Sequence, residues 1–131
     1  MPVEVHVVTP QREVWAGAAE MVIARGVAGE VGILAGHAPM LIRLAVGPLR
    51  IQQEEGGTLR AVVDGGFMHV TSGDDGTRVD VMASHAELQA EIDFEAAARR
   101  AQELEGRDDE DAKEELAKAE ARVNLRSTDP L

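Results

Sequence analysis

The sequence changes character near residue 87, and this change limits the folds that the chain can adopt. Before it, short apolar runs alternate with turns rich in glycine. After it, glycine becomes rare, and alanine, glutamate, lysine and arginine dominate. The first pattern is typical of strands and the second of helices. We therefore predict a β-domain over residues 1–86 and a helical part over residues 87–131.

The first part reads as a series of short strands. In VEVHVV, Val3, Val5 and Val7 alternate with Glu4 and His6, which places the valines on one face. Other apolar runs follow, separated by turn signals such as GVAGEVG, EEGG and SGDDG. The segments QQEEGGTLR and HVTSGDDGTRV look like hairpins with Gly-bearing loops. Many short strands at this spacing predict an antiparallel sandwich or barrel.

The second part predicts two helices. DFEAAARRAQELEG spaces its apolar residues as one helical face, with Asp93 as a fitting N-cap and Gly106 as a stop. Ser84 with Glu87 also matches a capping box, which leaves the start open by several residues. DDEDAKEELAKAEARVNLR is the second helix, with acids at its start and bases toward its end. The short GRDD connection predicts an antiparallel hairpin, and we expect the tail, residues 127–131, to fray.

The apolar stripes of both helices consist mostly of alanine. Such stripes bury little area, and burial stabilises by only ~25 cal/mol per Å² of apolar surface. We infer that the hairpin is weakly held by itself and is able to detach or unfold.

The composition excludes several kinds of function. The net charge is −11, aromatic residues are scarce and the first 98 residues hold no basic patch, which argues against nucleic-acid binding. The chain has no cysteine, so disulfides, thiolate nucleophiles and Cys-ligated zinc are excluded. The start MPVEVHVVTP does not resemble a signal peptide, and no apolar run reaches the ~18 residues of a transmembrane helix. We expect any membrane association to come through a partner.

No catalytic or metal-binding pattern stands out. The four histidines form no HxxxH or HxH pair, so a metal site is disfavoured. His37 lies in a Gly/Ala/Pro turn, where it is a general base, an interface residue or a turn residue bonded to local backbone. No nucleophile signature accompanies it, and GVAGEVG matches no phosphate-binding loop. These observations favour a binding or coupling protein over an enzyme.

Lys118, Arg122 and Arg126 recur every four residues on the second helix, one turn after Glu114. One interpretation is intrahelical Glu→Lys pairing together with the helix macrodipole. The other is an electrostatic contact with an acidic partner. The residues alone favour the first interpretation, because exposed charges on a helix contribute little to binding or stability.

The segment GEVGILAGHAPML, Gly29 to Leu41, resembles a signature of the ε subunit of F-type, proton-translocating ATP synthase. That family typically carries G-E-[IL]-G-[IV]-x-x-G-H-A-P-[LM]-L and then a G-x-[LIV]-[RK]-[IV] strand, which here reads GPLRI. VVDGGFMHV and VDVMAS resemble two further strands of the family. The resemblance runs in order along residues 3–104, and the hairpin is similar in composition and position.

The resemblance implies a β-sandwich of two five-stranded sheets followed by two α-helices. It implies a non-catalytic rotor subunit of the bacterial central stalk, bound to the γ subunit and the c-ring, that couples proton flow to ATP synthesis. Such a subunit is peripheral, at the cytoplasmic face of the cell membrane. The helices of the family fold against the sandwich or extend along γ into the catalytic α/β head, where they inhibit ATP hydrolysis.

The resemblance also assigns interface residues. Glu30 and His37 are similar to the positions that face the c-ring loops and γ. Lys118, Arg122 and Arg126 look similar to a basic helix that meets an acidic segment of the catalytic β subunit, although this second assignment rests on charge pattern and not on a motif.

Some bacterial members bind ATP through an I/L-D-x-x-R-A motif that opens the first helix. Asp93 and Ala97 match this motif here, but Ala96 stands at the arginine position. The loss of that cation removes a charge-assisted phosphate contact, and Arg99 and Arg100, one turn later, do not restore the same geometry. We expect weak or absent ATP binding and no cofactor.

Two other functions are consistent with the residues. One is a freestanding β-sandwich adaptor or ligand-sensing protein with a mobile helical hairpin. The other is a small hydrolase that uses His37, which the missing nucleophile motif disfavours. Copurification with a γ subunit would separate the stalk subunit from the adaptor.

Overall fold

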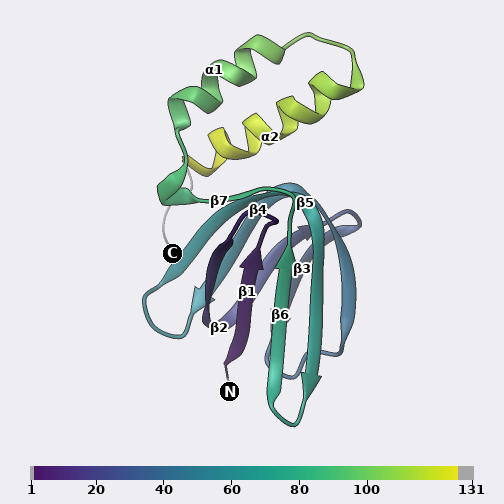
Figure 1. Ribbon diagram of the computed structural model, residues 1–131, viewed down its shortest axis with the longest axis vertical. Helices are drawn as coiled ribbons and strands as arrows, with labels where there is room; N and C mark the ends of the chain where they lie inside the picture. The colour runs from purple at the N-terminus through teal and green to yellow at the C-terminus, as the bar shows by residue number, and fades with distance from the viewer. Residues whose placement is uncertain (1, 127–131) are drawn as a thin grey trace.

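The computed structural model describes residues 2–126 as a strand domain with two helices stacked at one end (Figure 1). In chain order its elements are β1 (Val3–Val8), β2 (Glu13–Gly26), β3 (Gly29–Leu34), β4 (Met40–Gln53), β5 (Thr58–Gly73), β6 (Gly76–Met82), β7 (Ala86–Leu88), the 3-10 turn η1 (Gln89–Glu91), α1 (Phe94–Leu104) and α2 (Glu110–Arg126). The tail for which fraying is expected, residues 127–131, lies outside the described residues.

The strands form one hydrogen-bonded sheet in the order β1-β6-β5-β4-β2-β3, with β7 beside β5. Because β1 also pairs with β2, the sheet closes on itself. The long strands β2, β4 and β5, of 14, 14 and 16 residues, each run through both layers of the sandwich. One layer contains β3, β7 and one half of each long strand, and the other contains β1, β6 and the remaining halves.

Each layer therefore has five members, as the resemblance implies, but the two layers belong to a single continuous sheet. The sheet is also not wholly antiparallel, because β1 and β6 pair in parallel. The single sheet arises from the length of the strands that cross between layers, a property that short apolar runs in a sequence do not reveal.

Gly65 and Gly66 form the bend where β5 passes from one layer to the other. Both have positive φ, +82° and +111°. A Cβ added to Gly66 would lie 2.1 Å from the Met82 carbonyl oxygen, so no side chain fits there. The bend follows directly after Asp64, and it leaves that carboxylate on the outer face of the sheet, beneath the helices.

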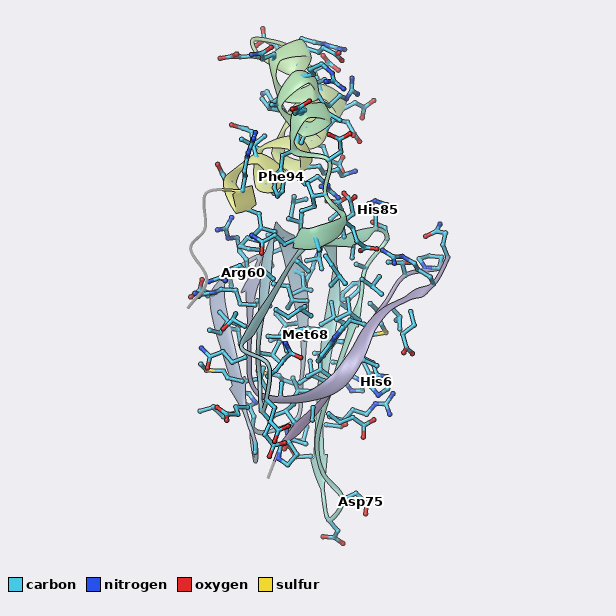
Figure 2. The ribbon with its side chains drawn as sticks, turned by 90° about the vertical axis from the view of Figure 1, so that its left-hand side faces the viewer. His6, Arg60, Met68, Asp75, His85 and Phe94 are labelled. Atoms are coloured by element: carbon cyan, nitrogen blue, oxygen red, sulfur yellow. The ribbon has the colours of Figure 1, made fainter. Side chains whose placement is uncertain are left out.

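The core between the layers consists of Val, Ile, Leu, Met and Ala side chains with Trp15 at its margin. Val3, Val5 and Val7 are buried in it and Glu4 is exposed, as the alternation in β1 predicts. Figure 2 shows Met68 within the body of the sandwich, and Met68 is fully buried. The core is therefore almost entirely aliphatic.

α1 begins at the predicted cap, because the Asp93 carboxylate accepts a hydrogen bond from the Ala96 amide at 3.0 Å. The alternative start near Ser84 is wrong. Residues 86–88 pair with β5 as strand β7, which uses their backbone groups in the sheet. The expected change from β to helix at residue 87 thus falls inside β7. Gly106, with φ of +82°, follows the end of α1.

Candidate interaction surfaces

The hairpin rests on the outer face of β4 and β5 through a small apolar cluster. Val62 on β5, Ile92 in the linker and Leu125 on α2 are buried there, with Phe94 and Ala121 partly buried beside them. A fully buried aliphatic side chain contributes roughly 1.5–3 kcal/mol. Three such residues hold the hairpin far less firmly than the extended core holds the sandwich.

Arg122 joins α2 to the sandwich through two carboxylates. Its Nη1 and Nη2 donate to the two carboxylate oxygens of Asp64 at 2.8 and 3.0 Å, and its Nε donates to Glu87 at 2.6 Å. Nη1 also donates to the Lys118 carbonyl at 2.9 Å. The Arg122 side chain is 11% exposed and the Asp64 side chain 6%. We call these three ionic residues, Asp64, Glu87 and Arg122, the hairpin clamp.

The clamp is sensitive to the loss of one member. Burial by itself lowers the pKa of Arg122, but the hydrogen bonds from Asp64 and Glu87 outweigh it and raise this pKa above its ordinary value. Arg122 is therefore charged over the whole physiological range. Removal of one partner from a buried pair costs about 3–5 kcal/mol, because the remaining charge is left without compensation.

The other two bases of the predicted basic line have different environments. Lys118 lies 3.2 Å from Glu115 and 3.9 Å from Glu114, which confirms the intrahelical pairing. Arg126 is exposed, and its guanidinium carbon lies 5.9 Å from the centre of the Phe94 ring. The arginine between them contacts the sandwich, which neither interpretation of the line predicted.

The linker between β7 and α1 is bonded to both parts of the molecule. Arg12, in the turn after β1, donates to the Glu91 carboxylate at 2.8 Å, and the Leu88 amide donates to the same oxygen at 2.9 Å. The Arg12 hydrogen bond lowers the pKa of Glu91 and raises the pKa of Arg12. On the other side, Gln89 donates to the Leu125 carbonyl at 2.9 Å.

The degenerate ATP motif borders a cavity of about 250 Å³ between the hairpin and the sandwich. Ala97 and Arg100 line it together with the clamp residues. Asp93 already caps α1, and the Ala96 amide is its donor. An anionic ligand would have to compete with two carboxylates for Arg122, so weak or absent ATP binding stays our prediction. Within residues 2–126, no group of three or more His, Asp or Glu side chains is placed to hold a metal ion.

Residues 35–39, between β3 and β4, form a loop that we call the His37 loop. It lies at the end of the sandwich away from the helices, where Figure 2 shows Asp75 at the tip of the β5–β6 hairpin. His37 is half-buried, and its amide donates to the Leu34 carbonyl at 3.1 Å. Its Nδ1 lies 2.7 Å from the Ala38 carbonyl oxygen. Because a carbonyl oxygen only accepts, Nδ1 is the donor of this bond, and in the corresponding imidazole tautomer Nε2 is the acceptor.

Glu30 is not brought together with His37. It is the second residue of β3 and is exposed, and its carboxylate lies 3.6 Å from Arg50 Nη2. His37 follows the far end of the same strand, and a strand advances ~3.3 Å per residue. The two predicted interface residues therefore lie at separate places on the sandwich surface.

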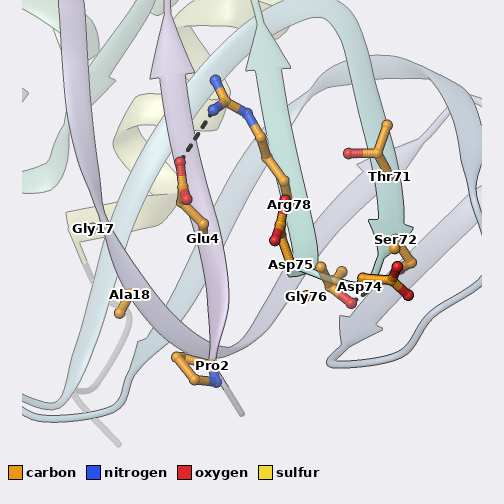
Figure 3. Close-up of a pocket in the computed structure, with 12 residues that line it drawn as sticks. Pro2, Glu4, Gly17, Ala18, Thr71, Ser72, Asp74, Asp75, Gly76 and Arg78 are labelled. Atoms are coloured by element: carbon orange, nitrogen blue, oxygen red, sulfur yellow. Dashed lines mark hydrogen bonds and ion pairs between the residues drawn. The ribbon is translucent and has the colours of Figure 1, made fainter.

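A hollow of about 810 Å³ lies beside the β5–β6 hairpin, with walls from β1, β2 and the hairpin tip (Figure 3). On its wall Glu4 accepts a hydrogen bond from Arg78 at 3.1 Å. Arg78 also bonds Asp80, which raises the pKa of Arg78. No motif in the sequence predicted this hollow.

Sequence reasoning missed the sandwich partners of Arg122. Asp64 gave one signal, because it is a carboxylate at the end of the apolar run LRAVVDGG. The sequence places Glu87 in a capping box with Ser84, but the structure places it in β7. The pairing depends on side chains 58 and 35 positions apart, which local patterns do not reveal.

The comparisons with known proteins point to one family. Residues 2–89 match the family model described as ATP synthase, Delta/Epsilon chain, beta-sandwich domain. The ATP synthase epsilon chain of Thermobifida fusca is 45% identical over 123 residues, which cover 91% of this chain and 88% of the relative. The corresponding chain of Streptomyces griseus is 43% identical over 129 residues, with 97% of both chains covered.

Two solved assemblies contain chains of similar fold. One is the Euglena gracilis mitochondrial ATP synthase, OSCP/F1/c-ring in rotational state 1, with a TM-score of 0.77 and 26% identity over 92% of this chain and 78% of that one. The other is the central stalk/c-ring of the Tetrahymena thermophila mitochondrial ATP synthase, with a TM-score of 0.57 and 18% identity over 95% and 93%. The second likeness concerns the fold alone.

Proposed function

The chain belongs to the ATP synthase delta/epsilon-chain family, and on this premise we propose that it couples proton translocation to ATP synthesis as the rotor ε subunit of a bacterial F-type enzyme. The ε chain is a structural and regulatory subunit of that complex and is not itself catalytic. The observation that carries the proposal is the match over the sandwich together with relatives that align along most of both chains.

The proposed partners of the sandwich are the γ subunit and the c-ring, and the proposed partner of the hairpin is the catalytic α/β head. A similar chain occurs in an assembly that includes F1 and a c-ring, which supports this assignment. An ε chain is a peripheral subunit of a membrane-associated complex. No helix within residues 2–126 is both long and apolar enough to cross a membrane. We place the subunit at the cytoplasmic face.

We assign residues 1–86 to γ and c-ring binding and residues 87–131 to regulation. The small apolar cluster and the hairpin clamp support a hairpin that is able to leave the sandwich as a unit. Arg122 cannot bond Asp64 and an acidic segment of the catalytic β subunit at once. The folded position of the hairpin and its inhibitory contact with the head therefore exclude each other.

The stalk role is tested by copurification. Tagged protein coexpressed with the γ subunit of the same bacterium is expected to elute with γ in equimolar amounts. A stable monomer without affinity for γ would overturn the proposal and favour the freestanding adaptor.

The regulatory role is tested by truncation in the assembled enzyme. The cut should remove residues 92–131 and keep β7, because β7 pairs with β5 and the sandwich needs it. We expect ATP hydrolysis to rise when the hairpin is removed. Unchanged hydrolysis by an enzyme that still retains the truncated subunit would contradict an inhibitory hairpin.

A further inference from the structure

The His37 loop is bonded to the β5–β6 hairpin by two hydroxyl groups. The Gly36 amide donates to Thr77 Oγ1 at 2.7 Å, and Ser72 Oγ donates to the His37 carbonyl at 2.6 Å. The two hydroxyl oxygens lie 3.0 Å apart. Thr77 is 5% exposed and Ser72 is half-buried. The bonds join residues 41 and 35 positions apart, so they are tertiary contacts and not turn contacts.

These contacts have one consistent arrangement of protons. Each hydroxyl carries a single hydrogen, and the Ser72 hydroxyl donates its hydrogen to the His37 carbonyl oxygen. Thr77 must therefore donate to Ser72, while it accepts from the Gly36 amide. The result is a directed chain from Gly36 N–H through both hydroxyls to His37 C=O. Hydrogen bonds in such a chain strengthen one another.

Side-chain packing does not hold the His37 loop against the β5–β6 hairpin in place of these hydrogen bonds. A hollow of about 410 Å³ lies between the loop and the hairpin tip, bordered by small residues: Ala35, Gly36, Ser72, Gly73, Gly76 and Thr77. Gly36 has φ of +86°, in the region that favours glycine. Because glycine has no Cβ, its backbone is free to adopt several other conformations. The loop therefore depends on the two hydroxyls, and on the His37 amide bond to Leu34, to keep one conformation.

We propose that Ser72 and Thr77 are positioning residues that fix the His37 loop for contact with the c-ring. They hold the loop and the hairpin tip as one rigid surface at the end of the sandwich away from the helices. With the loop fixed, the His37 imidazole is held by its bond to Ala38 and presents Nε2 to a hydrogen-bond donor of the c-ring. This inference rests on the proposed function, because it takes the ring as the partner.

The first test measures the hydroxyl chain in the full-length protein by amide hydrogen exchange. Thr77→Val keeps the shape of the side chain and removes its hydroxyl, whereas Thr77→Ser keeps the hydroxyl. We expect the Gly36 amide to exchange about tenfold faster or more in Thr77→Val, because it loses its acceptor. Thr77→Ser should remain close to the unmodified protein. Unchanged exchange in Thr77→Val would overturn the hydroxyl chain.

Two further variants keep this test decisive. Ser72→Ala removes the second hydroxyl at a less buried position, and it reports on the chain if Thr77→Val fails to fold. Thr58→Val removes a threonine hydroxyl at the start of β5, which β2 and β4 separate from the end of β3, and should leave the exchange of Gly36 unchanged. A Thr58→Val effect equal to that of Ser72→Ala would mean a general loss of stability and would overturn the local role.

The second test measures binding to an assembly of γ and the c-ring. Thr77→Val and Ser72→Ala are expected to bind about tenfold more weakly, with Thr77→Ser and Thr58→Val unchanged. Full affinity in a variant whose loop exchanges rapidly would overturn the positioning role. If the unmodified protein itself shows no affinity for the assembly, the proposed function fails, and the exchange result on the loop still stands.

Discussion

Strand β5 and helix α2 are both amphipathic and lie against each other, but they are held in different ways. β5 is bonded to β4, β6 and β7, and it places Val63, Met68 and Val70 in the closed core. α2 lies outside the sheet and contacts β5 through Leu125 and Arg122. We expect the strand to lose its place only when the sandwich unfolds, and the helix to leave while the sandwich remains intact.

The difference also concerns how each contact fails. Apolar burial is not directional, and it weakens in proportion to the area removed. The hairpin clamp depends on geometry and on complete pairing, because a charge left alone in a buried site is costly. A helix that carries few buried apolar residues and one buried ion network is therefore suited to discrete release. The following changes test this contrast.

The largest effect is expected from Arg122→Met, which leaves Asp64 and Glu87 without their cation. The free energy that holds the hairpin down should fall by about 3–5 kcal/mol. Since the chain has no cysteine, dyes on Glu103→Cys and Asp75→Cys can report the distance between hairpin and sandwich. Adding Asp64→Asn and Glu87→Gln should restore part of the loss. A hairpin that stays down in Arg122→Met would show that the clamp is dispensable.

The next comparison uses the same substitution in both regions. Leu49→Ala in the core should lower the free energy of unfolding of the sandwich by about 2–5 kcal/mol. Leu125→Ala, at an equally buried leucine, should release the hairpin and leave that free energy unchanged within about 0.5 kcal/mol. Urea unfolding followed by the fluorescence of Trp15, the single tryptophan, measures the sandwich. Equal shifts in both variants would contradict separate units.

A smaller effect is expected at Arg126, which lies over Phe94 at an exposed position. A cation–π contact at such a site contributes about 0.5–1 kcal/mol. Arg126→Gln should weaken the hairpin contact by that amount in the distance assay, and less in a Phe94→Leu background. The matched change Arg107→Gln, in the turn between the helices, should have no effect on the distance. An Arg126→Gln loss as large as that of Arg122→Met would refute this ranking.

The smallest effect concerns pH and the exposed pair of Arg12 with Glu91. The pKa of Glu91 is lowered in the folded protein, so the pair stabilises above the unfolded pKa of glutamate, about 4.3, and this contribution is lost as pH falls through the lower folded value. NMR titration should show the pKa of Glu91 rising toward its ordinary value in Arg12→Gln. An unmoved Glu91 titration would mean that the Leu88 amide accounts for the shift.

Local structure was predictable where neighbouring residues decide it. The valine alternation of β1 and the Asp93 cap depend on positions within four residues of each other, and both are found as predicted. The parallel pairing of β1 with β6 was not predictable, because it joins Val5 to Val79. Short-range propensity favours antiparallel hairpins, and only closure of the whole sheet brings these two strands together.

The candidate sites divide in the same way. The GHAP segment marks its own loop, but its anchors Ser72 and Thr77 lie at the paired ends of β5 and β6, which read as an ordinary hairpin in the sequence. The regular spacing of Lys118 and Arg122 predicts one shared role, yet the first pairs within its helix and the second with the sandwich. Spacing along a helix determines a face, and the neighbouring element determines what that face meets.

The long strands have a mechanical consequence. Between the end that carries the His37 loop and the bend beneath the hairpin, residues 40–44 of β4 pair with residues 66–70 of β5, and beyond the bend both strands continue in the other layer. A force along these strands loads many perpendicular hydrogen bonds in shear at once, and does not peel them apart one by one. The β1–β2 pairing also links the two layers through continuous backbone hydrogen bonding. We therefore expect the sandwich to resist twisting, and the flexible part of the molecule to be confined to the helices at one end.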